Sequence, residues 1–450
     1  MKTNKKIIVP KQIITVNNKD EVLRDYAVEI TENIITNIIP VADIKKEEDV
    51  EIIHYPNLTL IPGFVQTHIH LCQTLFRGLA DDLELLDWLK NRIFLFENAH
   101  NYNSLKASSK LGIYELQTKG TTTLLDMGTL NHMEAVFDEM LFSGMRGLSG
   151  KCMIDENDLV PKFKETTQRS LDYSVELAKK YHNTQSDRIK YAFAPRFALS
   201  CSYGLMKDTM DLVNGLEGSL YHTHSSENKD EIKAVKQKYG AENVEFFNSI
   251  GVLNDKTVLA HCIHLNEKEI GLLKDTQTRV SHCPSSNLKL GSGIANIPRY
   301  LKEGIQVSIG ADGAPCNNNL SIFTEMRLAA LIQKPIFGST VMDAKTTFKL
   351  ATIEGAKALH LEKEIGSIEV GKKADLVFLN LEQPDQCLLD NDENLYSNIV
   401  YSASHDTVKH VMIDGNWVVF DGKSVVYDKD ELFNSAKEEL KSLLKRIDEN

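Results

Sequence analysis

The segment Ile61-Pro62-Gly63-Phe64-Val65-Gln66-Thr67-His68-Ile69-His70 marks a change in the character of this sequence. From here to about His360, short apolar runs alternate with longer amphipathic stretches. Such alternation is typical of βα units, which build a parallel sheet covered by helices. The part of the chain that begins with this segment therefore decides the fold.

The short apolar runs of this part are predicted to be barrel strands. They are Gly63–His68, Thr122–Met127, Gly147–Ile154, Lys190–Pro195, Ser219–His224, Thr257–His261, Thr278–His282 and Gln306–Gly310. The predicted helices between them include Leu105–Lys119, Thr167–Tyr181, Glu227–Tyr239 and Leu320–Gln333. Eight strands over about 300 residues fit a (β/α)8 barrel with insertions.

Short β segments flank the barrel region on both sides. They are Lys6–Thr15, Tyr26–Ile30 and Ile34–Ile39 before it, and Asp375–Leu379, His410–Ile413 and Trp417–Phe420 after it. We predict an α/β fold, a distorted (β/α)8 TIM barrel with a small β-sandwich domain formed by both termini. The expected parts are 1–60 and 361–428 for the β-sandwich, 61–360 for the barrel, and 429–450 for a C-terminal helix.

The composition excludes several classes of protein. The chain has 450 residues, of which 42% are hydrophobic and 25% charged, as in ordinary globular proteins and unlike disordered or fibrous ones. Lys and Arg number 51 against 63 Asp and Glu, and a net charge of −12 disfavours nucleic acid as a partner. No apolar stretch approaches the length of a membrane span. The seven cysteines contain no C-x-x-C pair and no secretory signal is seen, so we expect a cytoplasmic protein.

Several of the 14 histidines follow predicted barrel strands. His68 and His70 end the first strand, and residues two apart on a strand face the same side. His224 ends the fifth strand, His261 ends the sixth, and Asp312 follows the eighth. Because catalytic residues of TIM barrels gather at the carboxyl ends of the strands, these side chains are predicted to form one site.

The residue types at this rim indicate hydrolytic chemistry. Imidazole and carboxylate ligands without thiolates suit zinc or ferrous iron. Such an ion lowers the pKa of a bound water toward neutrality. Glu227, three residues after His224, is placed to move protons between that water and a leaving group.

These residues together resemble the metal-dependent amidohydrolase superfamily, and within it the cytosolic aminohydrolase branch of adenosine-type deaminases, guanine deaminases and triazine hydrolases. The resemblance runs from residue 61 to the block GSIEVGKKADL at 366–376. Its most specific blocks are HSSE at 224–227, AHC at 260–262, SHCPSSNLKL at 281–290 and DGAPCNNN at 312–319. The last two look most like 5′-methylthioadenosine/S-adenosylhomocysteine deaminases. The segment Leu71–Trp88 is similar to 5′-deoxyadenosine deaminases and to triazine chlorohydrolases.

The resemblance implies a set of functional residues. It implies four ligands for one divalent metal ion per subunit, Zn2+ or alternatively Fe2+: His68, His70, His224 and Asp312. Glu227 would take a proton from the metal-bound water and deliver it to the ring nitrogen. His261 would orient the water and stabilise the tetrahedral intermediate, and Asp312 would assist the loss of ammonia.

Three further histidines are open to two interpretations. His222 has the same strand parity as His224 and could be the metal ligand in its place. It should lie one layer deeper, however, and is interpreted as a hydrogen-bonded interior residue. His264 and His282 are either supporting groups around the site or ordinary satisfied polar residues.

The substrate contacts are predicted from fewer signals. Glu97 matches the glutamate that accepts ribose hydroxyls in the thioadenosine deaminases, or it is a solvated helix charge. Trp88 borders the ligand or packs in the core. Lys151 replaces an arginine of those deaminases, and Arg196 replaces the histidine of their Pro-His pair. Because Lys cannot bind bidentately as Arg does, the 5′ substituent stays open.

The predicted function is metal-dependent hydrolytic deamination of an adenosine-type nucleoside to its inosine analogue and ammonia. The nucleoside would be 5′-deoxyadenosine, 5′-methylthioadenosine, S-adenosylhomocysteine or adenosine. The alternatives are a deaminase of guanine or of another purine or pterin, and a triazine-type chlorohydrolase or aminohydrolase. A catalytically inactive binding barrel would require the loss of a ligand or of Glu227, and neither is lost. A homodimer or homotetramer is expected from the resemblance alone.

Overall fold

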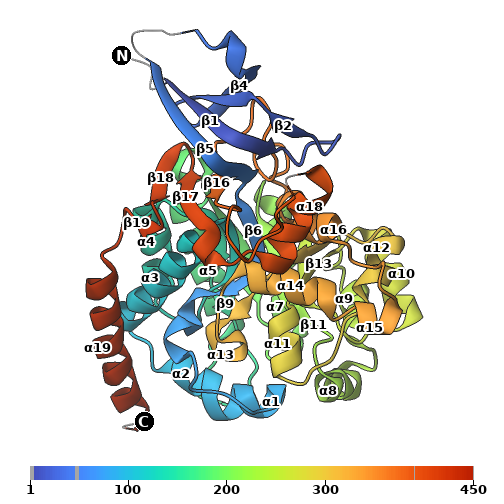
Figure 1. Cartoon of the computed structure of the whole chain (residues 1–450). Coiled ribbons are helices and arrows are strands. Elements are labelled where there is room, and N and C mark those ends of the chain that lie inside the picture. Colours follow the sequence, from blue (N-terminus) through green and yellow to red (C-terminus); the bar gives the residue numbers. More distant parts are fainter. Residues whose placement is uncertain (1–4, 46–49, 390, 449–450) are drawn as a thin grey trace.

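A parallel sheet closed into a barrel forms the centre of the computed structural model, which describes residues 5–45, 50–389 and 391–448 (Figure 1). Its main strands are β6 (Phe64–His70), β7 (Thr121–Met127), β8 (Arg146–Gly150), β10 (Ile189–Pro195), β11 (Leu220–Ser225), β12 (Thr257–His261), β13 (Arg279–His282) and β14 (Val307–Ile309). The short strand β15 (Asp312–Gly313) pairs with β6, and β14 pairs with β13. The chain between residues 307 and 313 therefore joins the two edges of the sheet, and the predicted barrel is confirmed.

One predicted barrel strand is interrupted. The stretch Gly147–Ile154 contains two strands, β8 and the short β9 (Cys152–Met153), which are separated at Lys151. The backbone N–H of Lys151 donates to the side-chain hydroxyl of Tyr191 at 3.2 Å. This bond takes Lys151 out of the ladder of backbone hydrogen bonds, so the prediction of one continuous strand was wrong.

Helices surround the barrel (Figure 1). The longer ones are α3 (Tyr102–Thr118), α4 (Glu134–Ser143), α5 (Thr167–Tyr181), α7 (Tyr203–Gly215), α8 (Lys229–Tyr239), α10 (Glu267–Thr276) and α14 (Ile322–Leu331). The shorter ones include η2 (Leu71–Phe76), α1 (Leu85–Trp88), η3 (Leu89–Ile93), α2 (Phe94–Asn98), α9 (Asn243–Ser249), α11 (Pro284–Lys289), α12 (Ile297–Lys302), α13 (Ala314–Asn317), α15 (Lys334–Phe337), α16 (Ala344–Leu350) and α17 (Ile353–Ala358).

Helix α8 begins two residues later than predicted. Asn228 is its N-cap, because its side chain accepts a hydrogen bond from the backbone N–H of Asp230 at 2.8 Å. The side chain of Glu231 accepts from the N-cap backbone in return, which completes a capping box. Glu227 therefore lies before the helix, in the segment that leaves β11.

The strands of both termini form a second sheet at one end of the barrel (Figure 1). They are β1 (Lys5–Ile14), β2 (Val22–Arg24), β3 (Tyr26–Thr31), β4 (Ile34–Pro40), β5 (Val50–Pro62), β16 (Leu376–Leu379), β17 (Val408–Ile413), β18 (Asn416–Phe420) and β19 (Lys423–Ser424). Apolar side chains of β1, β3, β4, β5, β16 and β17 share one buried cluster. Asn33, in the β3–β4 turn, donates to Asp414, in the β17–β18 turn, at 3.0 Å. The sheet thus curls over its own core, as the β-sandwich prediction requires, while the boundaries at 60, 360 and 428 stay predictions.

Strand β5 is the centre of this sheet and was not predicted. It pairs with β1 in parallel and with β16 antiparallel, and it leads directly into β6. Its middle contains Pro56 and Asn57, which are residues typical of turns. The pairing with β1 shifts register at this point because the strand contains a bulge. The sequence of this bulged strand therefore looked like a turn between two shorter strands.

The C-terminal helix α19 (Lys429–Asp448) lies along the side of the barrel against α3 (Figure 1). Its buried residues Ala436 and Leu443 pack in one apolar cluster with Leu75 and Phe96. This helix begins at Lys429 as predicted, and the last two residues of the predicted range, 449 and 450, lie outside the described residues. Among the residues that the structure describes, no helix is both long and apolar enough to cross a membrane.

A buried ion cluster joins the terminal sheet to the amino end of the barrel. Arg146, the first residue of β8, donates to both carboxylate oxygens of Asp375, at 2.6 and 3.1 Å, and to Asp414 at 3.0 Å. Burial lowers the pKa of the Arg146 guanidinium, but the charges of the two aspartates raise it more, so its pKa lies above the usual value. This arginine therefore remains charged and ties the two sheets together.

Candidate active site

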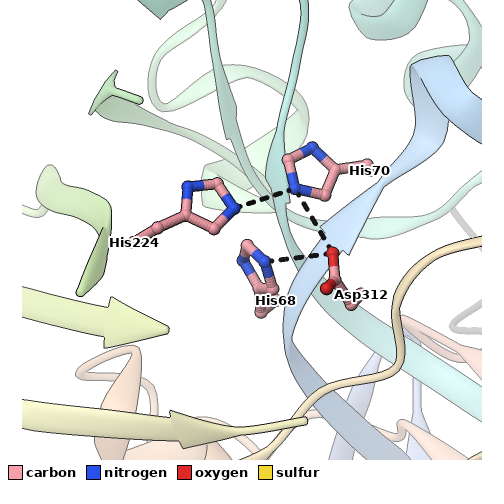
Figure 2. A group of neighbouring side chains, drawn as sticks. All are labelled: His68, His70, His224 and Asp312. Atoms are coloured by element: carbon pink, nitrogen blue, oxygen red, sulfur yellow. Dashed lines mark hydrogen bonds and ion pairs between the residues drawn. The ribbon is translucent and has the colours of Figure 1, made fainter. Parts of the chain in front are cut away.

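Three histidines and one aspartate converge at the opposite, carboxyl end of the barrel. His68 and His70 come from β6, His224 from β11 and Asp312 from β15, and Figure 2 shows their side chains directed at a common centre. One ligand atom of each lies within 4.8 Å of the others. The Nε2 atoms of His70 and His224 are 3.3 Å apart, and Oδ1 of Asp312 is 3.3 Å from Nε2 of His68 and 3.4 Å from that of His70. The structure thus brings together the four residues that the sequence analysis grouped.

The other nitrogen of each of these imidazole rings is held by a hydrogen bond. The acceptors of the three Nδ1 atoms are Nε2 of His222 at 2.8 Å for His68, the carbonyl of Met127 at 3.0 Å for His70, and the carbonyl of Arg196 at 2.7 Å for His224. Because Nδ1 carries the proton in each ring, the Nε2 lone pairs point to the common centre. His222 itself lies behind His68, where its own Nδ1 is 3.2 Å from the carbonyl of Val258.

The protonation states of this cluster suit a bound cation. Burial, followed by the charges of neighbouring histidines, lowers the pKa of His70 and of His224 well below its usual value, so both rings are neutral. Burial raises the pKa of Asp312, but His68 and the other histidines lower it more, so the carboxylate is ionised. The Nε2 atom of His68 is buried without a hydrogen-bond partner among the described residues.

The spacing of these atoms also fits a metal ion. Four ligands held about 2.0–2.1 Å from one tetrahedral ion lie roughly 3.3–3.4 Å from each other. Three of the six atom pairs, those given above, have this separation, and all six lie within 4.8 Å. Nitrogen and oxygen donors without a thiolate are suited to zinc or ferrous iron. The residues present therefore fit the divalent ion that the resemblance implies.

Glu227 and His261 lie beside this cluster. The Nε2 atom of His261 is 3.5 Å from Oε2 of Glu227 and 3.9 Å from Oδ2 of Asp312. Burial, and next the charge of Asp312, raises the pKa of Glu227 well above its usual value. A carboxyl group with a raised pKa can accept and return a proton near neutral pH.

The backbone at this rim adopts unusual conformations. Ser226, His261, Cys262 and Asp312 all have positive φ angles, of 53°, 73°, 47° and 62° respectively. Non-glycine residues adopt this left-handed region at a cost, and such residues are concentrated at functional sites. The chain thus turns sharply at the ends of β11, β12 and β14, where the candidate catalytic side chains project.

Some residues that support the site were not singled out from the sequence. Asn287 accepts from Nδ1 of His261 at 2.9 Å, and Ser286 donates to Oδ2 of Asp312 at 2.7 Å. Glu231 accepts from the backbone N–H of Glu227 at 2.9 Å. Ser286 and Asn287 could have been found from their place in the block SHCPSSNLKL at 281–290, which follows the seventh strand. The signal for Glu231 was its capping-box position three residues after Asn228.

A small cavity opens onto the cluster. Residues of the cluster and its neighbours line it together with other polar and apolar residues. The lining consists of His70, His224, Glu227, His261 and Asp312, the polar residues Gln73, Arg196 and Glu231, and the apolar or aromatic residues Leu85, Trp88, Leu89, Phe197 and Leu290. Gln73 follows His70 by three residues and was not singled out from the sequence. The Nε1 atom of Trp88 is a buried donor without a partner in the described part of the chain.

The four predicted substrate contacts, together with Glu227, which would reach the ring nitrogen of the substrate, divide into two groups. Trp88, Arg196 and Glu227 line the cavity. Lys151 does not: its buried ammonium forms an ion pair with Glu165 and lies 5.9 Å from the ring centroid of Tyr173 on α5. Its side chain is therefore directed outward from the barrel. Glu97 does not line the cavity either.

The two histidines of open interpretation lie outside the cluster. Nε2 of the half-buried His264 is 2.7 Å from the carbonyl oxygen of Ser292. His282 is fully buried, and neither of its ring nitrogens has a hydrogen-bond partner among the described residues. Burial lowers the pKa of His282 to about 3, so this ring is neutral.

Comparison with known proteins gives a consistent result. A model described as the amidohydrolase family matches residues 59–418. A 5′-deoxyadenosine deaminase of Methanocaldococcus jannaschii is 38% identical over 402 residues, which are 88% of this chain and 92% of that protein. A 5-methylthioadenosine/S-adenosylhomocysteine deaminase of Thermodesulfovibrio yellowstonii is 35% identical over 438 residues, which are 96% of this chain and 97% of that protein.

A solved structure shares nearly the whole fold. It is an adenosine deaminase from Xanthomonas campestris with bound zinc, which superimposes with a TM-score of 0.91 at 28% identity and covers 98% of this chain and 99% of its own. The similarity therefore includes the terminal sheet as well as the barrel.

Proposed function

The chain belongs to the amidohydrolase family, and we propose that it removes the exocyclic amino group of an adenosine-type nucleoside by hydrolysis. The products are the inosine analogue and ammonia. The observation that carries this proposal is the convergence of His68, His70, His224 and Asp312 beside Glu227 at one end of a cavity. The nucleoside part is supported by the names of the relatives given above, and 5′-deoxyadenosine is the first substrate to test.

We propose that His68, His70, His224 and Asp312 hold one divalent ion, which is zinc or ferrous iron. Such an ion, when bound, lowers the pKa of a water molecule and so supplies hydroxide near neutral pH. The hydrogen bonds on the three Nδ1 atoms fix the ring orientations and the tautomers that this binding requires.

Glu227 is proposed as the group that moves protons. Its raised pKa lets it accept a proton from the attacking water and pass it to a ring nitrogen of the substrate. The bond from the backbone N–H of Glu227 to Glu231 holds this residue before the start of α8, with its side chain in the cavity.

His261 and Asp312 are proposed to serve the tetrahedral intermediate. With Nδ1 of His261 donating to Asn287, its Nε2 can accept from the attacking water and, once protonated, donate to the developing oxyanion. Ser286 holds one oxygen of Asp312, and the same carboxylate assists the departure of ammonia.

The binding partner is proposed to be a small heterocyclic molecule, with Arg196 and Trp88 in contact with its ring. Both residues line the cavity, and both carry N–H donors. All seven cysteines are free, as in a reducing compartment, and we propose a cytoplasmic location. The homodimer or homotetramer expected from the resemblance stays a prediction.

The proposal is tested by measuring ammonia release by the purified enzyme, with metal analysis of the same preparation. The panel contains 5′-deoxyadenosine, methylthioadenosine, S-adenosylhomocysteine, adenosine, guanine and a chlorotriazine. We expect the adenosine-type nucleosides to react and 5′-deoxyadenosine to be among the best. Release of ammonia from guanine alone, or of chloride from the triazine alone, would refute the proposal.

A further inference from the structure

We infer that Glu97 is the internal anchor of Arg196 and Gln73 and not a sugar-binding residue, so that the 2′ and 3′ hydroxyls of a ribose are not recognised by this carboxylate. The inference rests on the proposed function, because it takes a purine-type ring as the ligand. Because Glu97 does not bind the sugar, we expect the enzyme to accept nucleosides that lack these hydroxyls and heterocyclic rings that carry no sugar.

Both carboxylate oxygens of Glu97 are already engaged. Oε2 accepts from Nη1 of Arg196 at 2.7 Å, and Oε1 accepts from Nη2 of Arg196 at 3.2 Å. Oε1 also accepts from Nε2 of Gln73 at 2.8 Å, and the thiol of Cys72 lies 3.9 Å from it. This is the bidentate arrangement in which an arginine and a carboxylate bind most strongly.

The position of Glu97 agrees with an internal role. The residue is 1% exposed and does not line the cavity, whereas its partners Arg196 and Gln73 do. Glu97 therefore lies behind these two residues as seen from the cavity. A sugar hydroxyl could reach its carboxylate only after Arg196 or Gln73 had moved away.

The buried positive charge of Arg196 also requires the carboxylate of Glu97 beside it. Arg196 is 2% exposed, and its positive charge acts on His68, His70 and His224. A divalent ion on those histidines would add further positive charge nearby. A buried guanidinium in such a place needs a carboxylate partner, since an unpaired buried charge is strongly destabilising. Exchanging this partner for a neutral hydroxyl would leave the guanidinium without compensation.

The bonds to Glu97 leave Arg196 and Gln73 each with a hydrogen-bonding group that can bind a heterocyclic ring. Arginine has five N–H donors, and the bonds to Glu97 together with a 3.7 Å contact to Cys152 do not use all of them. The guanidinium is also held 4.9 Å above the ring of Phe94, which fixes its position. Gln73 uses its amide nitrogen on Glu97, so its Oε1 is a buried acceptor without a partner among the described residues. Arg196 and Gln73, both held in place by Glu97, thus offer a hydrogen-bond donor and a hydrogen-bond acceptor to the edge of a heterocyclic ring.

The test combines one substitution with one change of substrate. Ammonia release is measured for the wild type and for Glu97→Gln, with 5′-deoxyadenosine and with 2′,3′,5′-trideoxyadenosine, which lacks the sugar hydroxyls. We expect removal of the hydroxyls to change kcat/KM of the wild type by less than about threefold. We expect Glu97→Gln to lower kcat/KM by the same factor, within about threefold, for both nucleosides, mainly through a higher KM.

A sugar-binding carboxylate would behave differently. The wild type would then lose about tenfold or more on removal of the hydroxyls, and Glu97→Gln would affect only the nucleoside that carries them. That result would overturn the inference. Glu97→Asp, which keeps the charge beside Arg196, is expected to restore part of the lost kcat/KM with both nucleosides equally.

Glu165→Gln is the matched control for the loss of a carboxylate from a buried ion pair. Glu165 pairs with Lys151, and neither residue lines the cavity. We expect this variant to keep the kcat/KM of the wild type with both nucleosides. Thermal unfolding of all variants is measured as well, to check that each is folded.

Free adenine and guanine are included to separate the inference from the proposed function. Ammonia release from the bases but not from nucleosides would refute the proposed function and support the inference, because a sugar would then have no site. Turnover of 5′-deoxyadenosine that depends on the hydroxyls through Glu97 would support the function and overturn the inference. No turnover of nucleosides or bases would overturn both.

Discussion

The two ends of the barrel both bury charged side chains, but they pair them differently. At the amino end, Arg146 is bonded to Asp375 and Asp414, so opposite charges compensate each other. At the carboxyl end, the Nε2 atoms of His70 and His224 face each other at 3.3 Å, and Nε2 of His68 has no hydrogen-bond partner among the described residues. The charges at the amino end are compensated within the protein, although Nη1 of Arg146 has no hydrogen-bond partner among the described residues. The ligand atoms at the carboxyl end converge instead on a centre that fits a cation.

This difference separates stability from activity along one barrel axis. A cluster of compensated charges holds two sheets together, while a cluster of converging lone pairs is proposed to bind an ion and to carry the reaction. In TIM barrels the amino end generally serves stability and the carboxyl end catalysis. Substitutions at the two ends should therefore give opposite results when stability and activity are measured on the same variants.

Removal of the metal should have the largest effect. Dialysis against a chelator is expected to abolish ammonia release and to lower the Tm, because an ion that binds only the folded state stabilises it. Addition of Zn2+ or Fe2+ should restore both properties. Full activity in a preparation that contains no divalent metal would show that the carboxyl-end cluster is not a metal site.

Glu227→Gln should come next in size. The variant keeps the shape of the side chain but cannot carry the proton, so kcat is expected to fall by about 10²- to 10⁴-fold. Its metal content and Tm should equal those of the wild type, because Glu227 is not among the four converging ligand groups. Unchanged turnover with metal bound would exclude Glu227 as the proton carrier.

Arg146→Met should show the reverse pattern at the amino end. Removing this arginine takes the charged partner from the buried Asp375. It leaves Asp414 with the more distant Arg188 at 3.8 Å and Lys373 at 4.0 Å, so the free energy of unfolding is expected to fall by about 3–5 kcal/mol. Folded enzyme, assayed well below its Tm, should keep the kcat of the wild type. Urea unfolding followed by circular dichroism measures the first quantity, and ammonia release the second.

Arg299→Met is the control for this change of charge. Arg299 pairs with Glu267 on the surface, where the arginine side chain is 35% and the glutamate 78% exposed. Exposed pairs of this kind contribute little to stability, so this variant should unfold nearly as the wild type does. Loss of kcat in folded Arg146→Met would mean that the two ends of the barrel are not independent.

The sequence predicted those parts of the molecule in which local pattern and position in the barrel agree. The barrel strands were recognisable as apolar runs, and histidines of the site lie at or next to the carboxyl ends of three of them. Strand β5 was missed because Pro56 and Asn57 make its bulge look like a turn. The continuous strand through Lys151 was wrong because a side chain, Tyr191, accepts its backbone N–H.

The substrate side of the site was less predictable for a different reason. Glu97 and Arg196 are 99 positions apart and lie on different elements, so no spacing in the sequence reveals their pairing. The resemblance related each position to a substrate group separately. Only the three-dimensional structure, in which the segment from η2 to α2 approaches the end of β10, shows that the two side chains bind each other.

The smallest effect that still distinguishes the two ends is expected at Asn287. Its Oδ1 accepts from Nδ1 of His261 at 2.9 Å, which directs Nε2 of that ring toward Glu227. Asn287→Ala should lower kcat by roughly 10- to 100-fold, as loss of such orienting bonds does around metal sites, while KM and metal content stay unchanged. His264→Gln is the matched control, because the His264 ring bonds to the carbonyl of Ser292 and does not line the cavity, and this variant should keep the kcat of the wild type. Equal kcat values for the two variants would mean that His261 needs no orienting partner, whereas loss of metal from Asn287→Ala would assign Asn287 to the metal cluster instead.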